Sequence, residues 1–118
     1  MKYMLLIHLN PKANAELTEE QQAAVGAAHE KLIGLTNESG EFVTMQPLAE
    51  PAQTTVVRVR DGKTVPSDGP LVEAEEFFGG YYVFDVAGKE RAVELAAMIP
   101  DAQWSAVEVR PFLELPEG

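Results

Sequence analysis

The segment YMLLIHL, residues 3–9, is apolar almost without a break. Successive side chains of a strand point to opposite faces of a sheet. Alternation therefore gives two sets, Tyr3, Leu5, Ile7 and Leu9 on one face and Met4, Leu6 and His8 on the other. A strand that is apolar on both faces is typical of one that is covered on both sides. We therefore expect a sheet with helices on one face and a further cover on the other.

Two helices are predicted, one in each half of the chain. The Asn10-Pro11 pair interrupts the first strand pattern, and Thr18 with Gln21 forms a capping-box arrangement before an apolar stripe. The first helix should span residues 19–38, with a stop at Gly40. The second should span residues 89–98, because its apolar positions follow helical spacing and Pro100 ends the pattern.

Further strands are predicted at residues 42–46, 54–60, 81–86 and 105–112. We expect the first two of these to be antiparallel neighbours. The pair Asp61-Gly62 favours a tight hairpin that turns the chain back through residues 63–65. Gly79 and Gly80 precede the strand at residue 81 and favour a bulge or a close backbone approach.

The order of elements is β-α-β-β, a hairpin extension, then α-β. This order matches the split βαβ pattern of ferredoxin-like α+β folds, here βαββαβ with an extra hairpin in a single domain over residues 1–118. Both helices would cover one face of an antiparallel sheet. The other face would carry Met4, Leu6 and one of Tyr81 or Tyr82, which is too apolar for a solvated surface. We therefore predict a homodimer whose sheets pack together.

Composition excludes several classes of function. Nineteen acidic against nine basic residues give a net charge of −10, which disfavours nucleic acid and anionic membrane surfaces as partners. The absence of cysteine excludes disulfides and thiolate chemistry. No segment is long and apolar enough to cross a bilayer or to act as a signal peptide, so we predict a cytoplasmic protein.

The chain resembles the YCII-related, DGPF-motif proteins over nearly its whole length. The matching segments, in order, are MKYMLLI (1–7), TVVRVRDGK (55–63), SDGP (67–70), GGYY (79–82) and VEVRP (107–111). The resemblance implies a dimeric α+β barrel with a pocket between the sheet and the surrounding loops. It also implies a catalytic dyad of a helix histidine, matching His29, and an acid near the end of that helix, matching Glu38.

Two positions depart from the family pattern. The motif Asp-Gly-Pro-Phe reads Asp68-Gly69-Pro70-Leu71 here, and Glu38 stands where the family has Asp. The family includes a dehydrochlorinase of chlorinated hydroxyhydroquinones, and some of its genes lie beside those of extracytoplasmic-function sigma factors.

His29 follows Val25 by four residues and precedes Leu32 by three, which places it on or beside the buried stripe of its helix. A half-buried imidazole near a carboxylate is suited to general acid or base catalysis. The alternative interpretation is a histidine that only forms a hydrogen bond across the seam between helix and sheet.

The remaining candidate residues also have two interpretations. Asp68 either organises a turn or reaches the pocket as a third catalytic residue, accompanied by substrate contacts from Gly69, Pro70, Tyr81 and Tyr82. The arginines either bind a carboxylate or phenolate of the substrate or remain solvated: Arg58, Arg60 and Arg110. Trp104 is predicted to be a packing residue.

No metal site and no cofactor are predicted, because no ligand spacing such as His-x-His occurs. Two functions remain open. One is a cofactor-free enzyme that transfers protons on a small molecule, such as a lyase or dehydrochlorinase. The other is a non-catalytic module that senses a ligand or binds a regulatory partner such as a sigma factor.

Overall fold

A computed structural model describes residues 1–116, so the last two residues of the predicted domain lie outside the described residues. The strands are β1 (Lys2–Leu9), β2 (Phe42–Pro47), β3 (Thr55–Arg60), β4 (Lys63–Asp68), β5 (Phe77–Asp85) and β6 (Ala106–Pro111). The helices are α1 (Pro11–Ala15), α2 (Glu19–Ser39) and α3 (Lys89–Ala97), with short 3₁₀ turns η1 (Pro51–Gln53) and η2 (Pro100–Gln103).

The main sheet has the strand order β2-β5-β1-β6, and all its neighbouring strands are antiparallel. Leu5 at the centre of β1 lies opposite Tyr82 of β5 and Val109 of β6. The strand order is consistent with the predicted ferredoxin-like α+β fold. The expectation that residues 42–46 and 54–60 are neighbours is wrong: β2 pairs with β5, whereas β3 pairs with β4 in a separate two-stranded sheet.

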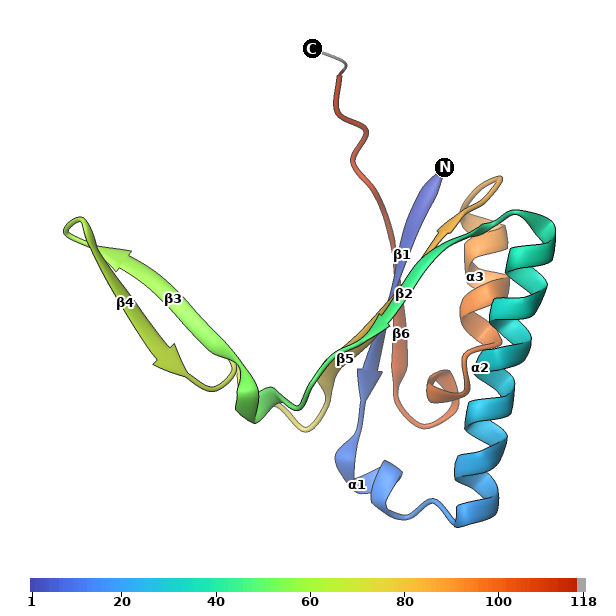
Figure 1. Ribbon diagram of the computed structural model, residues 1–118, viewed down its shortest axis with the longest axis horizontal. Helices are drawn as coiled ribbons and strands as arrows, with labels where there is room; N and C mark the ends of the chain where they lie inside the picture. The colour runs from blue at the N-terminus through green and yellow to red at the C-terminus, as the bar shows by residue number, and fades with distance from the viewer. Residues whose placement is uncertain (117–118) are drawn as a thin grey trace.

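Helices α2 and α3 lie on the same face of the main sheet (Figure 1). The core fills the space between these layers and contains the side chains that alternation placed on the inner face of β1. It comprises chiefly Tyr3, Leu5, Ile7, Leu32, Tyr82, Phe84, Val86, Ala92, Leu95 and Ile99. The predicted alternation of β1 is confirmed, since Tyr3, Leu5 and Ile7 are buried and the side chains between them are half-buried.

Local signals determine where α2 begins and ends. The side chain of Thr18 accepts a hydrogen bond from the backbone of Gln21, whose side chain accepts one from Thr18 in return, as predicted. Gly40 ends the helix in the left-handed region at φ 81°. Sequence reasoning missed the short helix α1, although Asn10 caps it and Pro11 occupies its first position.

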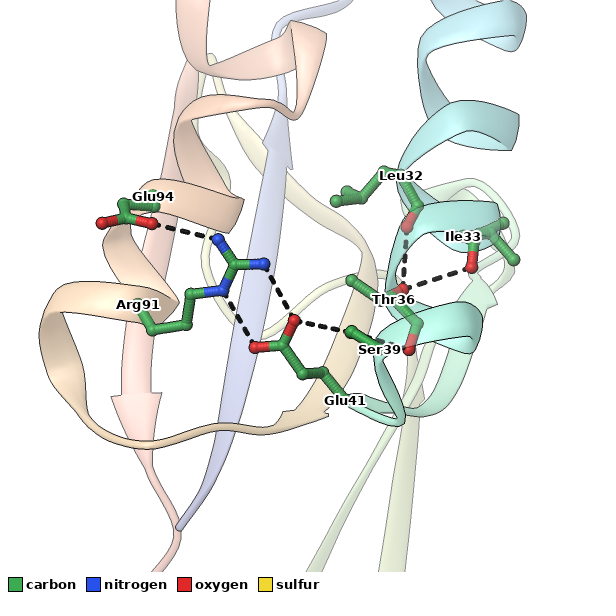
Figure 2. Close-up of polar contacts among 7 residues, drawn as sticks. All are labelled: Leu32, Ile33, Thr36, Ser39, Glu41, Arg91 and Glu94. Atoms are coloured by element: carbon green, nitrogen blue, oxygen red, sulfur yellow. Dashed lines mark hydrogen bonds and ion pairs between the residues drawn. The ribbon is translucent and has the colours of Figure 1, made fainter.

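An ion pair fastens α3 to the chain that leaves α2. Nε and Nη2 of Arg91 donate to the two carboxylate oxygens of Glu41, each over 2.9 Å, and Arg91 also bonds to Glu94 (Figure 2). The hydrogen bonds from Arg91 lower the pKa of Glu41 below its usual value. This two-point contact holds the two helices side by side over the sheet.

The predicted irregularity at Gly79 and Gly80 is present. The pairing register between β1 and β5 shifts between Ile7 and His8, so that Gly79 has no partner on β1. A Cβ atom on Gly80 would lie 3.1 Å from the carbonyl oxygen of Gln46 and 3.2 Å from Cα of Pro47. Glycine therefore lets β2 approach β5 closely at this end of the sheet.

Because the atoms that crowd Gly80 belong to the backbone, they cannot rotate away. We expect Gly80→Ala to lower the free energy of unfolding by about 1–3 kcal/mol, measured by urea denaturation. The matched control is Gly34→Ala in α2, where an added Cβ meets nothing within 4 Å. That substitution should raise stability by about 0.5–1 kcal/mol. Equal effects of the two substitutions would contradict the close approach at Gly80.

Candidate functional site

A pocket of about 420 Å³ opens between the N-terminal half of α2, the end of the main sheet and η2. Its walls are mostly apolar and include Ile7, Leu9, Leu17, Val25, Met45 and Trp104. The volume lies within the range of small-molecule sites. The close approach of β2 to β5 at the two glycines shapes one wall, because Gly79, Gly80 and Pro47 line it as well.

His29 lies at the wall of this pocket between a phenol and a carboxylate. Its Nδ1 is 2.6 Å from Oη of Tyr82, and its Nε2 is 3.5 Å from Oδ1 of Asp101. The imidazole stacks almost parallel to the Tyr82 ring, with 5.8 Å between the ring centroids. The three residues come from α2, β5 and η2, so only the folded chain brings them together.

The hydrogen-bonding partners indicate which nitrogen of His29 carries a proton. An ionised carboxylate only accepts hydrogen bonds, so attraction to Asp101 requires a proton on Nε2. In a neutral imidazole, Nδ1 then accepts from the hydroxyl of Tyr82. The distance of 3.5 Å from Nε2 to Asp101 exceeds the usual hydrogen-bond range. Nε2 therefore retains capacity for a hydrogen bond to a molecule in the pocket.

Tyr82 is a neutral phenol at physiological pH. Its side chain is fully buried, and this burial, followed by the negative charge of Asp101, raises the pKa of Tyr82 to about 12. A neutral hydroxyl can donate to Nδ1 of His29. Tyr82 thus holds the imidazole in one orientation from the sheet side.

Buried polar groups also come from η2 and from the residue that follows it. The Asp101 side chain is 8% exposed, and its contact with His29 is an ion pair only when the imidazole is protonated. Nε1 of Trp104 is buried and has no hydrogen-bond partner among the described residues. Sequence reasoning missed Asp101, whose only local signal is its position directly after the helix-ending Pro100, and it assigned Trp104 to packing alone.

The structure does not bring the predicted acid Glu38 to His29. Glu38 lies nine positions further along α2, which is roughly 13 Å along the axis and about 180° around it. Its side chain is exposed. Asp101 occupies the place beside the imidazole that the sequence analysis assigned to Glu38.

Asp68, Gly69 and Pro70 lie at the end of the β3–β4 hairpin, outside the His29 pocket. Asp68 is exposed, and Pro70 lines a second cavity of about 630 Å³ that also contacts His8. Of the two predicted tyrosines, Tyr81 lines the His29 pocket and Tyr82 binds His29 itself. The catalytic and substrate-binding roles predicted for all of these residues stay predictions.

His8 lies on the opposite face of the sheet from His29 and pairs with Glu108. In the described part of the chain, no cluster of three or more His, Asp or Glu side chains has a metal-binding arrangement. Within residues 1–116, no helix combines the length and hydropathy needed to span a membrane.

The family model for the YCII-related domain matches residues 1–116, which is nearly the whole chain. This protein belongs to the YCII-related family. It is also similar to an uncharacterized protein of Rhizobium meliloti, with 26% identity over 118 residues that cover 95% of this chain and 92% of the relative. The resemblance found in the sequence is therefore confirmed at the level of the family.

In this YCII-related protein, the hydrogen bond between Tyr82 and His29 should contribute to stability. We expect Tyr82→Phe to lower the free energy of unfolding by about 1 kcal/mol in urea denaturation at neutral pH. The control is Tyr3→Phe: Tyr3 is also buried, but its hydroxyl has no hydrogen bond to another described residue. The control should lose less than about 0.5 kcal/mol. An equal loss in both variants would contradict a specific role of the Tyr82 hydroxyl.

The free energies of unfolding of wild type and of Tyr82→Phe should depend differently on pH. Because the folded-state pKa of Tyr82 is raised to about 12, folding favours the neutral phenol. The contribution of Tyr82 is complete below its unfolded pKa of about 10 and is lost as the pH rises towards 12. Over this window the stability of wild type should fall towards that of Tyr82→Phe. A constant difference between the two proteins would refute the raised pKa.

Proposed function

We propose that the pocket binds a small, mostly apolar molecule and that His29 transfers a proton to or from it. The observation that carries this proposal is the position of His29 at the pocket wall, with Nδ1 held by Tyr82 and Nε2 left incompletely bonded beside Asp101. A partly buried imidazole of this kind suits lyase or dehydrochlorinase chemistry, in which a proton leaves one atom as a bond breaks at its neighbour.

The roles follow from the contacts. Tyr82 orients the ring from the sheet side. To accept a proton from the bound molecule, Nε2 must start without one, in the tautomer whose Nδ1–H donates to Oη of Tyr82. Asp101 then stabilises the imidazolium that forms, and the apolar walls exclude water from the bound molecule. Asp101 replaces Glu38 as the acid of the proposed pair, because only Asp101 lies near the ring. In this scheme Tyr82 and Asp101 are positioning residues, and His29 is the catalytic residue.

A chlorinated hydroxyquinol is the test substrate, because the family includes a dehydrochlorinase of such compounds. We expect wild type to release chloride and His29→Ala to lower kcat by at least about 100-fold, measured with a chloride assay. The matched control, Lys31→Ala, removes an exposed side chain from the same helix and should leave the rate unchanged. Equal rates for wild type and His29→Ala would remove His29 from the mechanism.

A non-catalytic sensor is the second candidate function. One observation favours it: Nδ1 of His29 is already engaged by Tyr82, which is the hydrogen bond across the helix–sheet seam that a purely structural histidine would make. Ligand binding by a wild-type protein that releases no chloride would favour the sensor over the enzyme. The link to a sigma factor and the cytoplasmic location stay predictions from the sequence.

We also propose that two chains associate through the sheet face that the helices leave bare, giving the dimeric α+β barrel. Met4, Leu6 and Val83 form an apolar strip along this face. The β3–β4 hairpin projects from the same side, with Val57 60% and Val59 58% exposed (Figure 1). Isolated two-stranded hairpins are marginally stable in water, so a second copy would support both features.

Sedimentation velocity tests this association. We expect wild type to be a dimer at micromolar concentration and Leu6→Arg to be a monomer with unchanged circular dichroism, because the charge would enter the apolar strip. The control is Val93→Arg, which places the same charge at an exposed position of α3 on the helix side. A wild-type protein that sediments as a monomer would overturn the dimer.

A further inference from the structure

The described residues that line the pocket include a carboxylate, Asp101, but no lysine or arginine. The carboxylate of Asp101 is more than nine-tenths buried, and its one polar side-chain contact among the described residues is His29 at 3.5 Å. When His29 is neutral, the pocket therefore contains one negative charge without a fixed positive partner.

The four arginines of the chain lie elsewhere. Arg58 and Arg60 are in the projecting hairpin, Arg110 is on the bare face of the sheet, and Arg91 is bound to Glu41. A carboxylate or phosphate entering the pocket would lose its hydration and meet Asp101 instead of a guanidinium. Such ligands are disfavoured because burying like charges near each other is costly.

Two further features favour a positive ligand. Trp104 lines the pocket, and aromatic faces attract ammonium groups. The net charge of −10 also raises the concentration of small cations near the surface. The other polar groups of the lining include the neutral amides of Asn14 and Gln22, which offer carbonyl oxygens as acceptors, and the indole N–H of Trp104.

We propose that the pocket selects a small organic ammonium, in which an apolar or aromatic body fills the walls and one positively charged nitrogen pairs with Asp101. This inference rests on the proposed binding pocket and adds the charge of its ligand. In the complex, the ammonium supplies the positive charge next to Asp101 that a protonated His29 would supply in its absence.

Three probes of nearly equal size and different charge test the proposal: benzylamine, benzyl alcohol and benzoate. Trp104 is the single tryptophan of the chain and lines the pocket, so its fluorescence reports occupancy in the unmodified protein. At neutral pH, we expect benzylamine to bind at least about ten-fold more tightly than benzyl alcohol, and benzoate to bind more weakly than either. These measurements on wild type require no variant to fold.

Asp101→Asn should remove the preference for benzylamine and bring its affinity to that of benzyl alcohol. Asp61→Asn is the control, because it changes the net charge equally at the exposed hairpin turn. The control should retain the preference, which separates a local ion pair from a general surface effect.

The outcomes separate this inference from the function on which it rests. If wild type binds benzyl alcohol as tightly as benzylamine, or prefers benzoate, the inference is overturned while the pocket stands. If Asp61→Asn weakens benzylamine as much as Asp101→Asn does, pairing with Asp101 is overturned. If none of the three probes binds, both the ammonium preference and the proposed binding pocket are overturned.

Discussion

The hydrogen bond between Tyr82 and His29 joins the centre of the sheet to its longest helix. Tyr82 is fully buried, so its hydroxyl must find a partner inside the protein, and over 2.6 Å it finds the imidazole of His29. The rings of Phe84, Tyr82 and His29 stack successively, which carries the apolar packing of the core up to the pocket wall. This contact holds the imidazole of His29 at the pocket wall from the sheet side.

The site lies where regular pairing of the sheet is interrupted. Gly79 leaves the β1–β5 register, Gly80 allows β2 to approach β5, and both glycines line the pocket at this end of the sheet. The loop after α3 then brings Asp101 and Trp104 against the same space. A cavity thus forms at an irregular sheet end while the regular middle of the sheet remains packed.

The two faces of the sheet have different physical roles. The helix-covered face contains the core and the polar group around His29, with α3 fastened by the Arg91–Glu41 pair. The opposite face has an apolar strip and a projecting hairpin but no helix cover among the described residues (Figure 1). The pocket proposed to bind a ligand and the surface proposed for association of chains therefore lie on separate faces of the sheet.

The sequence by itself predicted the parts of the fold that local signals control. The alternation of residues 3–9, the capping box at Thr18, the stop at Gly40 and the Asp61-Gly62 turn each depend on neighbouring residues, and each is found in the structure. The pairing of residues 42–46 with 54–60 was predicted incorrectly, because strand partners are chosen by long-range packing that proximity in sequence does not encode.

The same distinction applies to the site. Helical spacing was sufficient to place His29 on the sheet side of α2, since that spacing is local. Its acid partner was sought at Glu38 on the same helix, but helix geometry turns that side chain to the opposite side, and the carboxylate beside the imidazole belongs to Asp101, 72 positions later in the chain. Which phenol and which carboxylate meet His29 was decided only by the tertiary structure, because three elements distant in sequence converge there through burial of the core.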